Sequence, residues 1–319
     1  MNHRDTENTE KIKKIAGRLL AEKRVDAVIG FRPGTVSLIS APTVARTEEE
    51  AAGLHWDRFC GVNLANYLPK REDKIAIVAK GCDSRSIVGL VAENQIKREN
   101  LYIIGIPCTG MIDRAKVISL AESPEVELTE NGEEVTIKAD GKQSTVALSD
   151  ILQDNCQGCL HRNPAVFDEL VGKKVEEAGG SDINAAVAKV EAMSQDERWN
   201  HFDQMFSTCI RCYACRNACP LCYCEQCFAD DSQPQWCGKS TNPVDVKIFH
   251  IFRAYHCAGR CTDCGACVRA CPVGINVREL TGKLEKEVRE LFGCEAGMSL
   301  EAIPPLGVYL EKDPQEFIK

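Results

Sequence analysis

The chain has 319 residues, with 39 basic and 47 acidic side chains, a formal net charge of −8 and an apolar content of 44%. This composition is typical of a globular protein with two or three domains, and it argues against disorder and fibrous structure. The acidic balance argues against a dedicated nucleic-acid binder, which needs a basic surface. The longest uncharged apolar stretch, residues 101–112, is shorter than the ~20 residues of a membrane-spanning helix.

The cysteines are the most informative part of the composition. The first ten residues are polar and carry acidic side chains, so we expect no secretory signal or transit peptide and a cytoplasmic location, where thiols stay reduced. The 19 cysteines then indicate metal binding rather than disulfides. Three precede residue 150 and thirteen lie between Cys209 and Cys271. The sequence therefore predicts a cysteine-poor N-terminal domain and a cysteine-dense C-terminal domain.

Residues 1–165 predict an α/β domain. Apolar residues at helical spacing between positions 12 and 20 indicate an amphipathic first helix. Apolar runs follow at 25–29 and 36–39, and a further pattern over 54–64 predicts a second helix.

A strand–helix–strand unit is the clearest pattern in this domain. Residues 75–79 predict a buried strand, 84–95 a helix and 101–106 another strand, which together predict a right-handed βαβ crossover with parallel strands. Residues 126–148 then predict a small three-stranded meander, because Asn-Gly and Asp-Gly, both strong hairpin signals, separate its strands.

Two segments repeat the spacing C-x2-C-x2-C-x3-C-P, one beginning at Cys209 and one at Cys261. This is the spacing of bacterial two-cluster ferredoxins, in which the fourth cysteine of each run binds the other run's 4Fe-4S cluster. The predicted ligands are Cys209, Cys212, Cys215 and Cys271 for cluster one, and Cys261, Cys264, Cys267 and Cys219 for cluster two. Zinc sites usually take two separated pairs of ligands, so they account less well for this repeat.

The insertion between these runs contains further thiols. Cys222, Cys224 and Cys227 fall within six residues, close enough to bind one metal. The candidates for a fourth ligand are Cys237, Cys257, His250 and His256. We predict either an additional metal site, holding zinc or an iron–sulfur cluster, or buried free thiols.

A third set of four cysteines comes from separate segments. Both strands of the βαβ unit end in a cysteine loop, with Cys82 and Cys108, and the carboxyl ends of neighbouring parallel strands open into one crevice. Cys156 and Cys159 add a C-x2-C pair after the meander. Single cysteines are commonly buried apolar residues, but these four together predict a four-thiolate site.

The order of these motifs resembles the coenzyme F420 hydrogenase/dehydrogenase beta-subunit family over residues 25–165. The matching segments are Lys80-Gly-Cys-Asp, Ile106-Pro-Cys-Thr-Gly and the following C-x2-C pair. The resemblance identifies the four-thiolate site as a third 4Fe-4S cluster and implies a flavin, usually FAD, beside it, hydride exchange with a deazaflavin and transfer of single electrons to partner subunits. The chain departs from the family pattern in its first loop, and its ferredoxin runs follow this domain instead of preceding it.

A flavin would place its phosphates on a loop of this domain. The amides around Gly81, Thr109 and Gly110, with Lys80 and Arg85 as cations, are the candidate cradle. The alternative for both cations is ordinary solvated charge. The sequence has no G-x-G-x-x-G fingerprint and predicts no catalytic residue.

We therefore predict four regions. Residues 1–165 form the α/β domain that resembles the F420 family, 166–207 a helical linker, 208–294 an α+β two-cluster ferredoxin-like domain with helices and a cysteine-rich insertion, and 295–319 a C-terminal tail. The tail has little core of its own, which suggests that it docks on a partner.

Three functions remain open. The favoured one is an iron–sulfur subunit of a cytoplasmic oxidoreductase that relays single electrons through three 4Fe-4S clusters. Its partners would be a flavoprotein, a hydrogenase, a formate dehydrogenase or a heterodisulfide-reductase-type complex. The second function is an FAD-containing subunit that exchanges hydride with a deazaflavin or nicotinamide. The third is a metal-binding scaffold or sensor without turnover.

Overall fold

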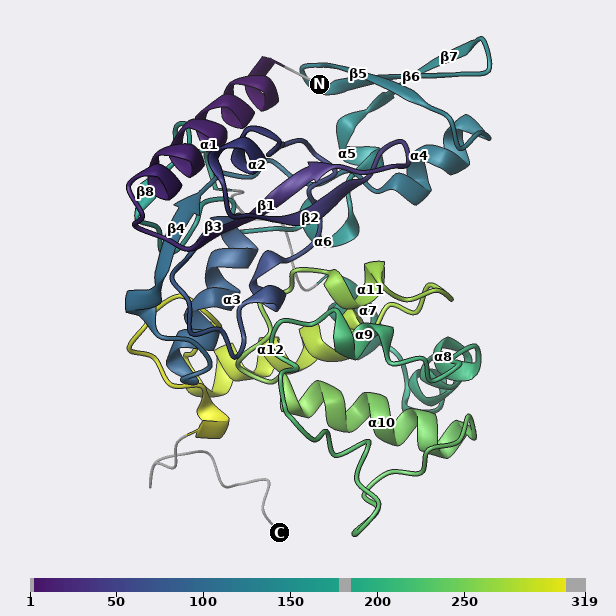
Figure 1. Ribbon diagram of the computed structural model, residues 1–319. Helices are drawn as coiled ribbons and strands as arrows, with labels where there is room; N and C mark the ends of the chain where they lie inside the picture. The colour runs from purple at the N-terminus through teal and green to yellow at the C-terminus, as the bar shows by residue number, and fades with distance from the viewer. Residues whose placement is uncertain (1–2, 178–184, 308–319) are drawn as a thin grey trace. The chain divides into compact units, whose positions relative to one another are not determined.

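A computed structural model describes residues 3–177 and 185–307 (Figure 1). The chain divides into two compact units, one of Met1–Ser84 with Gln95–Ser181 and the other of Arg85–Asn94 with Asp182–Lys319. Helix α3 (Gly81–Ala92) contributes residues to both units.

A five-stranded sheet in the order β2-β1-β3-β4-β8 forms the centre of the first unit. Strands β1, β3, β4 and β8 are parallel, and β2 pairs antiparallel with β1 at the edge. Every residue of β3 is buried, as expected for an inner strand of a sheet that is covered on both faces. The strands span Ala27–Pro33 (β1), Ser40–Ala45 (β2), Ile75–Ala79 (β3), Leu101–Gly105 (β4) and Glu169–Leu170 (β8).

Helix α1 (His3–Ala21) packs beside this sheet and contacts β1, β3 and the short helix α2 (Glu48–Ala52) (Figure 1). Its inward face carries Ile12, Ile15 and Leu19, all buried. The predicted amphipathic first helix is confirmed.

The predicted βαβ unit is also confirmed. Strands β3 and β4 pair in parallel from Ile75 opposite Leu101 to Ala79 opposite Gly105. Helix α3 begins at Gly81, three residues earlier than predicted, and the Ser84 amide donates its first helical hydrogen bond to the Lys80 carbonyl at 2.8 Å. The cysteine of the first loop therefore lies in the first turn of a helix.

The predicted meander forms a separate antiparallel sheet of β5 (Glu127–Asn131), β6 (Glu134–Ala139) and β7 (Lys142–Ala147). Gly132 and Gly141 have positive φ values of 65° and 75° in its two turns, as hairpins of this length require. The inward side of β6 packs with α4 (Arg114–Ala121) and α5 (Leu148–Ile151).

One prediction for this unit is wrong. The segment 54–64 is not a helix: α2 ends at Ala52, His55 forms a β-bridge with Phe31, and only a 3-10 turn, η1 (Leu64–Tyr67), follows. Pairing with a remote strand outweighs the local helical spacing there. The apolar run at 36–39 forms a turn that leads into β2, which begins at Ser40.

The described part of the second unit, including residues 185–307, consists of helices and loops without a strand. Helix α10 contacts α8 and α12, α12 also contacts α7, and the one-turn helices α9 and α11 contact each other. The prediction of strands in the C-terminal domain is therefore wrong for the described residues, because loops around the cysteines and the proline-containing insertion leave no extended run to pair. The helices span Ala185–Glu191 (α7), Gln195–Ser207 (α8), Ala214–Asn217 (α9), Pro243–His256 (α10), Ala266–Arg269 (α11) and Arg278–Phe292 (α12), and η3 spans Pro305–Gly307.

Candidate metal centres

The two ferredoxin-type runs fold into loops of the same shape. Arg211 and Tyr213 have positive φ values of 54° and 60°, and Asp263 and Gly265, at the equivalent positions of the second run, have 52° and 70°. Each loop then enters a one-turn helix, α9 or α11. Alternation of right-handed and left-handed residues turns successive backbone N–H groups into a concavity that suits an anion. The loops therefore fit a negatively charged group held by thiolates.

Cys271 of the second run lies with the cysteines of the first. Burial raises the pKa of Cys209 and of Cys215, and the charge of Cys271 adds to the shift at both thiols. Cys209 and Cys271 also pack against one apolar cluster, which includes Phe206. The structure thus brings together the four thiols that the sequence predicts for cluster one.

Cys219 of the first run has the reciprocal position. Burial raises the pKa of Cys261 well above its usual value, with contributions from Cys267 and Cys219. Burial also raises the pKa of Cys267 to about 12, and Cys219 and Cys264 act in the same direction. The thiols predicted for cluster two therefore neighbour one another as well.

Four of the five cysteines of the first unit also lie on neighbouring segments. Cys82 lies in the first turn of α3, Cys108 follows β4, and Cys156 lies in α6 (Asp154–Gln157). Burial raises the pKa of Cys108 to about 11, and the charge of Cys156 adds to this. The Cys108 amide donates to the Arg162 carbonyl at 2.8 Å, which fixes the segment after Cys159 against the Cys108 loop.

Gly81 allows this convergence. A side chain at this position would place its Cβ 2.1 Å from the His161 carbonyl oxygen, so only glycine permits the two backbones to approach. The donor set, four thiols from three segments of the chain, fits a 4Fe-4S cluster.

Lys80 carries a fixed positive charge beside this group. Its Nζ donates to the carbonyls of Cys60 at 2.9 Å and Val62 at 3.0 Å and forms a 2.8 Å ion pair with Asp83. Burial lowers the pKa of Lys80, but Asp83 and the neighbouring Cys82 and Cys108 outweigh it and raise the pKa to about 12. A buried cation of this kind stabilises thiolates over thiols.

The two cations predicted to hold a flavin phosphate are bonded to other groups. All three donors of Lys80 are used, and Arg85 is buried and donates to the Ala296 carbonyl at 2.7 and 2.9 Å. The carbonyls of Thr109 and Gly110 accept hydrogen bonds from Arg58, at 3.1 and 3.0 Å. The side chains of Lys80 and Arg85 are therefore already engaged, and the contact of a flavin phosphate with the amides around Gly81, Thr109 and Gly110 stays a prediction.

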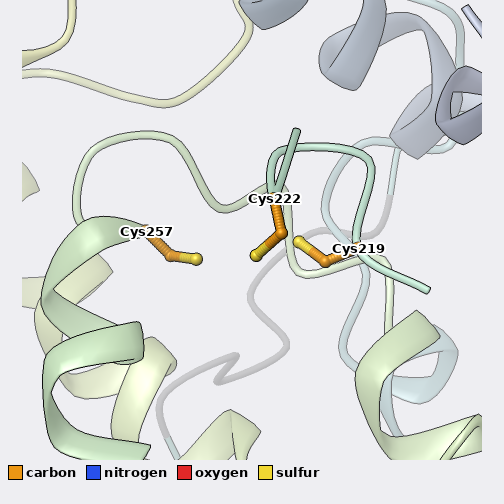
Figure 2. Close-up of side chains that lie close together, drawn as sticks. All are labelled: Cys219, Cys222 and Cys257. Carbon is orange, nitrogen blue, oxygen red and sulfur yellow. The ribbon is translucent and has the colours of Figure 1, made fainter. Parts of the chain in front are cut away.

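The thiols of the insertion are arranged differently from the single predicted group. The sulfurs of Cys219, Cys222 and Cys257 point toward one another and lie within 4.8 Å (Figure 2). Hydrogen bonds from the thiols of Cys219 and Cys257 lower the pKa of Cys222 to about 3. Cys224 is exposed, and Cys227 packs near Phe249.

Two of the predicted fourth ligands lie elsewhere. His250 stacks on Phe206 with ring centroids 4.5 Å apart, and its Nε2 is 3.4 Å from the Cys209 sulfur. Burial lowers the pKa of His250 to about 4, so the ring is neutral at pH 7. Cys237 is buried with its sulfur 3.8 Å from an Arg211 nitrogen.

Arg253 is a residue near the thiols that the sequence analysis did not single out. It is 4% exposed, and its Nη2 donates to the Cys215 carbonyl at 3.0 Å. The signal was present in the helical spacing, because Arg253 follows the buried Val246, Phe249 and His250 on one face of α10. A buried cation on the otherwise apolar face of a helix indicates that a negatively charged group lies beside it.

Two protein families match the chain. A 4Fe-4S dicluster domain matches residues 205–275. The family described as the C terminus of the coenzyme F420 hydrogenase/dehydrogenase beta subunit matches residues 72–223.

Relatives match over nearly the whole chain. The chain is 24% identical to the F420-dependent formate dehydrogenase subunit beta of Methanocaldococcus jannaschii, over 90% of this chain and 91% of that protein. It is 25% identical to the F420-dependent formate dehydrogenase 1 subunit beta of Methanococcus maripaludis, over 91% and 90%. A solved chain from the F420-reducing nickel–iron hydrogenase complex of Methanosarcina barkeri aligns with 18% identity and a TM-score of 0.39, over 50% of this chain and 63%, less than two thirds, of that chain.

The cysteine groups and the matched families define an iron–sulfur electron-transfer subunit of an oxidoreductase. More particularly, residues 72–223 match the coenzyme F420 hydrogenase/dehydrogenase beta-subunit family and residues 205–275 match a 4Fe-4S dicluster domain, which confirms the predicted resemblance. Among the described residues, no helix has the length and apolarity needed to cross a membrane.

Proposed function

We propose that the chain is the electron-relaying beta subunit of a complex that oxidises formate or hydrogen with a deazaflavin coenzyme as the redox partner. Proteins similar along about nine tenths of the chain are F420-dependent formate dehydrogenase beta subunits. The observation that carries the proposal is that Cys271 neighbours the thiols of the first loop and Cys219 those of the second, on two loops of equal shape. That arrangement suits two one-electron carriers held side by side.

Each cluster has its own four ligands. Cluster one takes Cys209, Cys212, Cys215 and Cys271, cluster two takes Cys261, Cys264, Cys267 and Cys219, and cluster three takes Cys82, Cys108, Cys156 and Cys159. The clusters supply one-electron transfer, and the chain supplies ligands, backbone N–H donors and buried cations that set their potentials. Lys80 serves cluster three in this way.

The four regions keep their predicted roles in this proposal. Residues 1–165 carry cluster three, 166–207 lead into the ferredoxin-like domain at 208–294, and 295–319 form the tail that docks on a redox partner. Within these regions, residues 178–184 and 308–319 lie outside the described part of the chain. The proposed place of work is the cytoplasm, where thiolate ligands stay reduced.

The match to this family also supports a second candidate, a flavin-bearing subunit that itself exchanges hydride with the deazaflavin. Flavin analysis of the purified chain separates this candidate from the relay.

The test is electron transfer in the assembled complex. We expect the chain to copurify with a formate- or hydrogen-oxidising subunit, and addition of formate or hydrogen without oxygen to bleach its iron–sulfur absorption. Cys261→Ser should abolish reduction of the deazaflavin while the partner still oxidises its substrate with an artificial acceptor. Equal deazaflavin reduction by the variant complex would contradict the relay.

A further inference from the structure

The insertion between the two ferredoxin runs surrounds a cavity of about 640 Å³ that lies within the second unit. Four thiols line it, those of Cys222, Cys224, Cys227 and Cys257. None of the four belongs to a ligand set proposed above. Four unassigned thiols on one cavity point to a metal centre beyond the two clusters of a dicluster domain.

Three arginines line the same cavity, and one of them has no carboxylate partner among the described residues. Arg216 pairs with Asp230 at 2.7 Å, and Arg260 forms an ion pair with Glu93. The buried Arg253 forms no ion pair with a carboxylate of the described residues, and its Nε has no hydrogen-bond partner there. The thiols of Cys257 and Cys222, which line the cavity, act on Arg253 more strongly than those of Cys219 and Cys267. A buried guanidinium is strongly unfavourable without negative charge beside it, so the cavity suits a negatively charged, thiolate-bound occupant.

We propose that Cys222, Cys224, Cys227 and Cys257 bind a further iron–sulfur cluster in this cavity, with Arg253 as its buried counter-charge. Cys257 caps the C-terminus of α10 one turn beyond Arg253, so a single helix places both the ligand and the cation. Four thiolates on a cluster leave a net negative charge beside the guanidinium. The assignment goes beyond the proposed three-cluster relay.

The spread of the four sulfurs favours a cluster over a single ion. Tetrahedral zinc with bonds of ~2.3 Å holds its sulfurs only about 3.8 Å apart. Among the described residues, the metal-ligand group with all atoms within 4.8 Å contains Cys222 and Cys257 with Cys219, but neither Cys224 nor Cys227. An occupant that reaches all four cavity thiols is therefore larger than an ion.

The rival occupant is a single ion on Cys219, Cys222 and Cys257 (Figure 2). It would take Cys219 away from cluster two. Backbone hydrogen bonds join Cys222 to Cys219 at 3.1 Å and Cys261 to Cys257 at 2.9 Å, so the cavity directly adjoins both ferredoxin runs. A cluster in this position would extend the relay from cluster two to the face that bears the cavity.

The first experiment compares metal contents of the full chain purified without oxygen. The variants are Cys224→Ser and Cys227→Ser, with Cys294→Ser as the control, because Cys294 does not line the cavity. We expect each cavity variant to lose about four iron and four sulfide relative to the wild type, with the paramagnetic signals of the dicluster domain retained. The control should keep the wild-type content. Cys224 is exposed, so its replacement leaves the core intact.

Wild-type iron in both cavity variants would overturn the proposal. So would the loss of one zinc in Cys222→Ser and Cys257→Ser alone, which would establish the single ion. Failure of the proposed relay gives a different result. In that case the wild-type chain itself contains no iron, whereas failure of the cavity proposal leaves iron in the wild type and in both cavity variants.

A second measurement does not depend on losing a ligand. Arg253→Gln should lower the reduction potential of one cluster at unchanged iron content, and Arg253→Lys should restore it towards the wild-type value, because the charge is kept. Unchanged potentials of all clusters in Arg253→Gln would contradict the role given to Arg253.

Discussion

Lys80 and Asp83 form an ion pair that excludes solvent, with side chains 2% and 0% exposed. The sequence indicated a solvated lysine or a phosphate ligand, because a cation after a strand is usually accessible. Burial arises from Phe31 and Trp56, whose rings lie 5.2 and 5.9 Å from the ammonium and come from other parts of the chain. Contacts of this kind have no local signal in the sequence.

Removing one partner of this pair should be costly. We expect Lys80→Met to lower the free energy of unfolding by about 3–5 kcal/mol, because Asp83 stays buried without its counter-ion. Thermal unfolding under anaerobic conditions measures the effect. Lys11→Met is the matched control, since its pair with Glu7 is exposed and is worth less than about 1 kcal/mol. Equal shifts in both variants would contradict the structural role of Lys80.

Asp5 provides a prediction about pH. Burial, followed by the charge of Glu130, raises the pKa of Asp5 from 3.8 to about 6. The folded chain therefore keeps a proton that the unfolded chain has lost in this window, so stability falls as pH rises from about 4 to 6 and stays reduced above it. Asp5→Asn should remove a loss of about 3 kcal/mol. Denaturation of both proteins between pH 4.5 and 7.5 tests this, and a stability difference that does not grow with pH would count against it.

Helix α10 and the two cysteine loops show which elements the sequence can predict. The loops are local: three ligands fall within seven residues, so spacing alone predicts their shape and their metal. The position of Arg253 beside four thiols depends on how α10 packs, which spacing does not encode. Strand β8 has only two residues and forms by pairing with β4. A strand of this length leaves no local pattern, so the sequence predicted a helical linker over this segment.

The exchange of ligands between the loops is testable at this scale. We expect Cys219→Ser to change the paramagnetic signal of the cluster bound by Cys261, Cys264 and Cys267, because its thiol neighbours those residues. Cys271→Ser should change the signal of the other cluster. Electron paramagnetic resonance of the reduced proteins distinguishes the two. If each variant disturbed only the cluster of its own run, the assignment of fourth ligands would be wrong.

At the scale of the whole molecule, the uneven distribution of cysteines corresponds to two compact units. The sequence predicted the parallel core, the meander and the family. It did not predict that α3 is divided between the units, because Arg85 binds the carbonyl of Ala296, more than two hundred residues away. The sequence also did not show that Lys80 and Arg85, the cations of the predicted flavin cradle, are buried, because their burial depends on tertiary packing.

The proposed cluster three would make the first unit a part of the relay. We expect Cys156→Ser to lower the iron content by about four atoms per chain and to leave both ferredoxin clusters in place. Cys60→Ala, which removes a buried thiol outside the set, should keep all iron. Iron and sulfide analysis measures both variants. An unchanged content in Cys156→Ser would remove cluster three from the account.

The most direct test of the account is the inorganic content of the wild-type chain purified under strict exclusion of oxygen. Three clusters predict at least about 12 iron and 12 sulfide per chain, and the cavity cluster raises each number to about 16. The protein should be brown and should bleach on reduction. A colourless, folded protein with zinc in place of iron, still active in its complex, would contradict the account.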